Sequence, residues 1–183
     1  SFSPFLFLEV KTKKMQKKDQ ESTTHTLGVR FTGMRIWEKE NQNFRKFDKA
    51  WGKDIKDHEF SDKLGSFFGK QGAELVESAL KWTRELEMWM EENKKLRFIS
   101  SSILFVYDGE HLDKGLRMSM IDFAHVFPLE HETKDNSYLY GLKTVIRSLE
   151  EIQSKLLERE EGDGVVAVEG GADVSIGSGA VIS

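Results

Sequence analysis

The sequence of 183 residues contains no cysteine. This absence excludes a disulfide framework, a thiolate metal site and a cysteine nucleophile. It fits an intracellular protein, and we expect the cytoplasm or the nucleus as its location. Long apolar runs are also absent, and no stretch reaches the roughly 20 residues that a membrane-spanning helix needs. The apolar start of the chain lacks a basic flank and is followed at once by Glu9, so no signal peptide is predicted.

An excess of positive charge is missing as well, because the formal net charge is −4 at pH 7. This balance gives no general electrostatic reason to expect nucleic-acid binding. The charge is unevenly placed, however, since residues 11–18 are strongly basic and residues 150–163 are mostly acidic. The composition is otherwise that of an ordinary globular protein, and the length suffices for one domain with its own core, which we expect to be a monomer.

Hydrophobic periodicity predicts an α+β domain in which antiparallel strands pack on helices. Apolar residues spaced three and four apart predict helices at 58–68, 73–92 and 137–159. Alternating β-branched and aromatic residues predict strands at 27–37, 97–107 and 116–123, and a polar connection follows the first of these at 38–45. Asp108 and Gly109 form a turn signal, which indicates that the last two strands make a hairpin.

The C-terminal residues 162–183 are rich in Gly, Ala, Val and Ser and contain no aromatic residue. Such a composition cannot bury much apolar surface, and it favours a flexible tail. An alternative is a coil of a hexapeptide β-helix, which the sequence of residues 172–182 superficially resembles. Two coils without stacked neighbours cannot bury their faces, so disorder is the preferred interpretation.

Asp122 lies near the end of an otherwise apolar predicted strand, opposite a partner strand that carries Ser100, Ser101 and Ser102. A carboxylate there is costly if it is buried without a partner, so it must face solvent, a cation or a hydrogen-bond network. Phosphoryl transfer needs a carboxylate on rigid backbone to hold Mg²⁺ beside nucleotide phosphates. The alternative is an exposed Asp that closes a strand, and this alternative is preferred if the Asp-Phe dipeptide is taken alone.

Longer motifs change that balance. Three occur in order: Ser-Ser-Ile-Leu-Phe-Val-Tyr-Asp-Gly at 101–109, Met-Ile-Asp-Phe-Ala-His-Val-Phe-Pro at 120–128 and Tyr-Leu-Tyr-Gly-Leu-Lys-Thr-Val-Ile at 138–146. With Leu-Gly-Val-Arg-Phe-Thr-Gly-Met-Arg-Ile-Trp at 27–37 and Trp-Gly-Lys at 51–53, they closely resemble the C-terminal lobe of the inositol polyphosphate kinase family, which includes the multikinase and inositol hexakisphosphate kinase branches.

The resemblance implies a protein-kinase-like fold and ATP-dependent phosphorylation of inositol polyphosphates, with Mg²⁺ accompanying ATP. It implies that Asp122 is the metal-binding Asp, and that Ser101 and Ser102 lie beside the nucleotide and the metal. His125 follows the Asp-Phe-Ala stem, and it either faces the substrate phosphates or packs on Phe127 at a strand end. The substrate stays open, because the Asp-Phe-Ala-His stretch favours the multikinases and the Leu-Gly-Val-Arg strand favours the hexakisphosphate kinases.

The basic segment gains a second interpretation from the same resemblance. Lys14, Lys17 and Lys18 share one face if the segment is helical, and Lys11 precedes them. Taken alone, such a run is usually a solvated charge cluster. In the family, a basic helix before the Gly-Val-Arg strand lines the inositol phosphate site, so these four lysines are expected to bind substrate phosphates.

The chain departs from the family in its first residues. The family motif Pro-x-x-x-Asp-x-Lys-x-Gly has only a degenerate counterpart around Glu9 and Lys11, and we expect the N-terminal lobe of the family to be missing. We therefore divide the chain into a divergent segment 1–10, a kinase C-lobe 11–160 and a flexible Gly/Ala/Val-rich tail 161–183. Half a cleft would lose most of the positioning that catalysis needs, so a non-catalytic module that binds inositol phosphates or phosphoinositides is the alternative. A helical interaction protein ranks last, because it does not explain the motifs.

Overall fold

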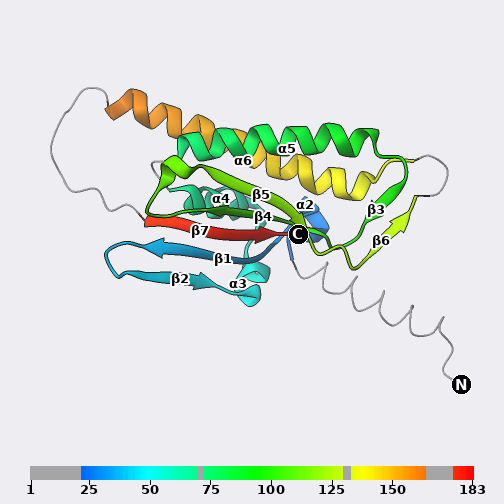
Figure 1. The fold of residues 1–183 in the computed structure, drawn as a ribbon, viewed down its shortest axis with the longest axis horizontal. Coiled ribbons are helices and arrows are strands. Elements are labelled where there is room, and N and C mark those ends of the chain that lie inside the picture. The colour runs from blue at the N-terminus through cyan, green and yellow to red at the C-terminus, as the bar shows by residue number, and fades with distance from the viewer. Residues whose placement is uncertain (1–21, 70–71, 130–132, 164–174) are drawn as a thin grey trace, which may run out of the picture.

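A computed structural model of the chain describes residues 22–69, 72–129, 133–163 and 175–183 (Figure 1). Its strands are β1 (Phe31–Glu38), β2 (Asn43–Phe47), β3 (Leu96–Phe98), β4 (Ser102–Tyr107), β5 (Leu116–Ile121), β6 (Val126–Pro128) and β7 (Ser175–Ile182). Its helices are α2 (Thr24–Leu27), α3 (Lys49–Asp54), α4 (Phe60–Phe68), α5 (Ala73–Glu92) and α6 (Asn136–Asp163), with 3-10 turns at Asp57–Glu59 and Leu112–Lys114.

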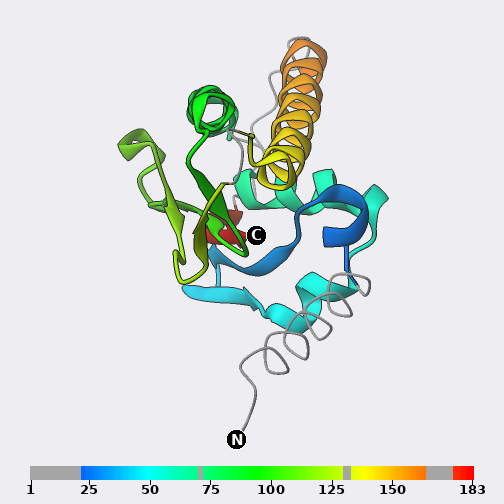
Figure 2. The same cartoon turned by 90° about the vertical axis from the view of Figure 1, so that its right-hand side faces the viewer.

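Five strands form one antiparallel sheet in the order β2-β1-β7-β4-β5, and β3 pairs with β6 in a separate two-stranded sheet. Helices α4, α5 and α6 cover one face of the larger sheet, as the end-on view in Figure 2 shows. This is the α+β arrangement of antiparallel strands on helices that the sequence predicts. None of the helices within the described ranges is both long and apolar enough to cross a bilayer.

The core lies between this helical layer and the sheet. Fully buried side chains come from β1, β4, β7, α4 and α6, and they include Phe31, Phe105, Ile182, Phe67 and Leu149. The sequence periodicity predicted α5 and α4 within two residues, because both helices present one apolar stripe to this core. The connection expected at 38–45 contains the turn and the first half of β2, whose polar residues are exposed at the edge of the sheet.

The prediction of a flexible tail over 161–183 is wrong for its two ends. Helix α6 continues to Asp163, and β7 lies in the middle of the sheet between β1 and β4 (Figure 1). The composition of this segment wrongly predicted flexibility, because a central strand is held by backbone hydrogen bonds on both sides. These bonds depend little on side-chain type. Two of the few apolar residues of the strand, Ala180 and Ile182, are completely buried in the core.

Candidate functional site

The predicted strand 97–107 is broken in the structure, and the break faces Asp122. Strands β4 and β5 pair Ser102 with Ile121, and continuing that register would place Phe98 opposite His125. Instead, β3 and β6 pair Phe98 with Val126. Residues 99–101 therefore face residues 122–125, three against four, which is a β-bulge. The bulge takes Asp122 out of the alternation of the strand and leaves its side chain exposed.

The backbone of this bulge is strained. Ser100 has φ = 59° and Asp122 has φ = 62°, which places both residues in the left-handed region. An L-residue pays about 1–2 kcal/mol for that conformation. Strain of this kind persists where the surroundings over-determine it, and it concentrates at functional sites. Two hydrogen bonds cross the bulge: Ser101 Oγ donates to the carbonyl oxygen of Asp122 at 3.0 Å, and Ile99 N donates to that of His125 at 3.0 Å.

The structure thus brings Ser101 and Asp122 together. The contact involves the backbone carbonyl oxygen of Asp122, whereas a metal would bind its side-chain carboxylate. Ser101 and Ser102 are buried, and the hydroxyl of Ser101 holds the backbone of Asp122. The far end of the same hairpin is fixed by the predicted turn, where Asp108 accepts a hydrogen bond from Lys114 Nζ at 2.7 Å and one from Glu110 N at 3.0 Å. These bonds, with that to His111, hold the pKa of Asp108 well below its usual range.

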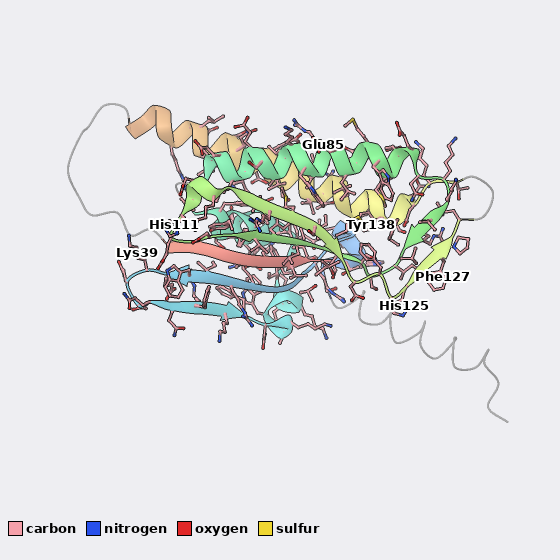
Figure 3. The ribbon with its side chains drawn as sticks, in the orientation of Figure 1. Lys39, Glu85, His111, His125, Phe127 and Tyr138 are labelled. Atoms are coloured by element: carbon pink, nitrogen blue, oxygen red, sulfur yellow. The ribbon has the colours of Figure 1, made fainter. Side chains whose placement is uncertain are left out.

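His125 is half-buried in the turn before β6, and its backbone carbonyl takes part in the bulge. Figure 3 shows His125 and Phe127 at the same end of the molecule, and Phe127 is exposed. Both interpretations of this histidine stay predictions. Lys11, Lys14, Lys17 and Lys18 lie outside the described residues, as do Glu9 and the rest of segment 1–10.

A divalent metal at this site would have few protein ligands. Among the described residues, no group of three or more His, Asp or Glu side chains is gathered closely enough to hold an ion. One exposed carboxylate, that of Asp122, nevertheless suits Mg²⁺, because proteins commonly bind this ion through one or two carboxylates together with the phosphates of a substrate. The residues present therefore fit a metal that arrives with a nucleotide, and they do not fit an all-protein metal cage.

Two hollows lie near these elements. The first, of about 220 Å³, lies behind the bulge and is lined by Val29, Ser100, Ser101, Tyr138 and Ile182, among others. Tyr138 closes part of it, and burial together with the negative charge of Asp135 raises the pKa of Tyr138. With a neutral phenol at this position, the guanidinium of Arg30 is the charged group in the lining, which otherwise combines apolar side chains with serine and threonine hydroxyls.

The second hollow, of about 650 Å³, is open and carries basic side chains that the sequence analysis did not single out. We call it the basic hollow; its basic lining residues are His25, Lys53, Lys56 and His58. One carboxylate of the lining, that of Asp57, accepts a hydrogen bond from Thr26 Oγ1 at 2.8 Å. The signal in the sequence was the Trp-Gly-Lys motif at 51–53, whose lysine was not considered as a ligand. Converging ammonium and imidazole groups suit a ligand with several phosphates.

Comparison with known proteins identifies the family. The model of the family "Inositol polyphosphate kinase" matches residues 7–150. The chain belongs to the inositol polyphosphate kinase family. Two similar relatives are an inositol polyphosphate multikinase of Schizosaccharomyces pombe, 33% identical over 146 residues, and inositol hexakisphosphate kinase 3 of Mus musculus, 30% identical over 170 residues. These alignments cover 74% and 79% of this chain, but only 54% and 43% of the relatives, so the chain spans about half their length.

Solved structures agree with this assignment. A structure of an inositol phosphate multikinase superposes with a TM-score of 0.68 at 26% identity, covering 76% of this chain and 69% of that one. Ipk2 from S. cerevisiae, crystallised with ADP and Mn²⁺, gives a TM-score of 0.66 at 21% identity with the same coverage, and shows the shared fold. The predictions of the family and of its α+β fold are confirmed, whereas β7 lies outside the residues that the family model matches.

Proposed function

We propose that this chain carries the metal-binding half of a kinase that transfers the γ-phosphate of ATP to inositol polyphosphates. The observation that carries the proposal is the exposed carboxylate of Asp122, held at a strained bulge in a chain of the inositol polyphosphate kinase family. Mg²⁺ bound there with ATP would neutralise charge that develops on the transferred phosphoryl group. Ser101 keeps the backbone of Asp122 in place, and the two residues directly adjoin the paired ends of β4 and β5.

The phosphates of the inositol substrate are proposed to bind at the basic hollow. Its lysines lie on α3 and just after it, and Ser22 in its lining is the last residue of segment 11–22, which the family resemblance implies to be the basic helix. Lys11, Lys14, Lys17 and Lys18 would extend the same positive surface if that helix forms. A polyanion would be attracted by several cations at once, which explains how the substrate could bind without a deep apolar pocket.

The test separates catalysis from binding. It uses the longest product of the gene, assayed with ATP, Mg²⁺ and labelled inositol polyphosphates. Asp122→Asn should lower kcat by at least about 100-fold, because even outer-shell changes at metal sites cost 10–100-fold. It should leave inositol polyphosphate affinity, measured by calorimetry, unchanged. The double change of Lys53 and Lys56 to Ala should instead weaken that affinity.

Matched controls are available on the surface. Asp113→Asn removes an exposed carboxylate from the turn after β4, and the double change of Lys39 and Lys81 to Ala removes two exposed lysines outside the basic hollow. Both controls should behave as wild type. Inositol phosphate binding without any turnover would overturn the kinase assignment and leave the non-catalytic binding module.

A further inference from the structure

Asp135, directly before α6, is the one carboxylate among the described residues that is completely buried, with 0% of its surface exposed. Acidic residues are almost never fully buried without partners, because removing the charge from water is costly. The partners of Asp135 therefore indicate why the residue is there. None of the roles assigned above to Asp122, Ser101 or the basic hollow uses it.

One set of partners caps a helix. The Oδ1 atom of Asp135 accepts hydrogen bonds from Ser137 Oγ at 2.8 Å and from Tyr138 N at 3.2 Å, both in the first turn of α6. A carboxylate at this position also faces the positive end of the helix dipole. A cap alone needs only this side of the carboxylate.

The other oxygen reaches a distant strand. Asp135 Oδ2 accepts a hydrogen bond from Phe98 N at 2.7 Å, across 37 residues of sequence. Phe98 is the last residue of β3 and directly precedes the bulge residues 99–101. Its ring lies 6.1 Å from that of Phe123, the neighbour of Asp122, and 6.0 Å from that of Tyr138 in α6.

We infer that Asp135 is a positioning residue for Asp122, because its carboxylate ties the end of β3 to the start of α6 and so fixes the one-residue offset of the bulge. The inference rests on the proposed metal-binding role of Asp122. Without this tie, residues 99–101 can slide into the register of β4 and β5, which places Asp122 opposite Ser101 within a regular ladder. The left-handed conformation that exposes the Asp122 carboxylate is then lost.

The substitution Asp135→Asn tests the tie. Whichever way the amide turns, its NH₂ group cannot accept a hydrogen bond, so either Phe98 N or the first turn of α6 loses its acceptor. Ser137→Ala is the matched control, since it removes one hydrogen bond from the cap and leaves Phe98 N in place. Asp122→Asn serves as the reference for loss of the metal ligand.

Two readouts are measured on the whole chain. Electron paramagnetic resonance reports Mn²⁺ binding in the presence of ADP, and hydrogen exchange reports the amides of residues 98–101 and 121–125. Asp135→Asn should weaken Mn²⁺ binding by about 10–100-fold, the usual effect of losing an outer-shell partner of a metal site. It should also speed exchange at both segments at least about tenfold. Ser137→Ala should change each quantity less than about twofold.

The outcomes distinguish the metal-binding role of Asp122 from the positioning role of Asp135. If Asp122→Asn weakens Mn²⁺ binding but Asp135→Asn does not, the metal role of Asp122 stands and the positioning role of Asp135 is overturned. Equal losses in Asp135→Asn and Ser137→Ala would also overturn it, since the cap alone would then account for the effect. If Asp122→Asn binds Mn²⁺ and ADP like the wild type, the metal role fails and the inference fails with it.

Discussion

Gly52 and Gly65 show how the tertiary environment decides whether a position requires glycine. Both lie inside helices, where alanine is ordinarily preferred over glycine by about 1 kcal/mol. A Cβ atom added at Gly52 would lie 2.1 Å from the carbonyl oxygen of Phe31, so α3 and β1 can pack this closely only if the residue is glycine. A Cβ atom at Gly65 would lie 3.4 Å from Ile152 Cγ1, which is an ordinary contact.

Only one of the two alanine substitutions should therefore lower the stability of the fold. Gly52→Ala should lower the free energy of unfolding by about 1–3 kcal/mol or more, because a backbone oxygen cannot move aside as a flexible side chain can. Gly65→Ala should leave it unchanged or raise it by up to about 1 kcal/mol. Urea titrations of both variants give the comparison, and a shift of the two midpoints in the same direction would contradict the packing argument.

The pairing of α5 with α6 is supported at the scale of elements by charges on their exposed sides. Glu91 in α5 accepts hydrogen bonds from Lys134, just before α6, and from Lys143 Nζ in α6 at 2.9 Å. These bonds, that of Lys134 first, lower the pKa of Glu91, and Glu91 in turn raises the pKa of Lys143. The contacts are solvent-exposed, so each is worth little, but together they hold the start of α6 beside the end of α5.

The lowered pKa predicts a pH dependence of stability. The folded state favours the charged form of Glu91, so its contribution is fully present above the ordinary pKa of 4.5 and is lost as the pH falls through the lower folded value. Glu91→Gln should be slightly less stable than wild type at pH 7, and the difference should disappear in strong acid. The control is Glu85→Gln on the same helix (Figure 3). The unfolding midpoints of Glu91→Gln and wild type are measured from pH 7 to pH 2. A difference between them that stays constant over this range would refute this account.

The sheet of the whole molecule is completed by the last described segment of the chain. Strand β7 separates β1 from β4, so the two halves of the sheet meet only through it. Its end is fixed by a reciprocal pair of backbone hydrogen bonds between Arg30 and Ser183, at 2.7 Å and 2.8 Å. A segment at the end of a chain thus joins elements whose sequences lie far apart.

This position predicts a large effect of a small change. Ile182→Ala should lower the free energy of unfolding by about 2–5 kcal/mol, the usual cost of emptying a buried isoleucine site, because its side chain is 1% exposed. Val181→Ala, which alters the half-buried neighbour on the opposite side of the strand, should cost clearly less. Guanidinium titrations measure both values, and an effect near zero for Ile182→Ala would show that the segment is a loose tail.

Sequence alone placed the elements whose signals are local. The stripe of α5, the Asp108–Gly109 turn and the β4–β5 hairpin follow from periodicity and turn chemistry within short windows. The family motifs at 101–109 and 120–128 led to Asp122 and Ser101, which the structure places together. The basic hollow was missed, because His25, Lys53 and His58 converge only when α2, α3 and the following turn pack together.

The sequence by itself determined the family, the fold class and the identity of the candidate metal ligand, because these depend on residue types in a fixed order. The tertiary structure alone decided how that ligand is presented. A one-residue offset between two strand pairs, fixed by contacts such as that of Asp135 with Phe98, exposes Asp122. It also decided the place of β7, because backbone hydrogen bonds from two distant strands act on any sequence that can extend and carry a few buried apolar residues.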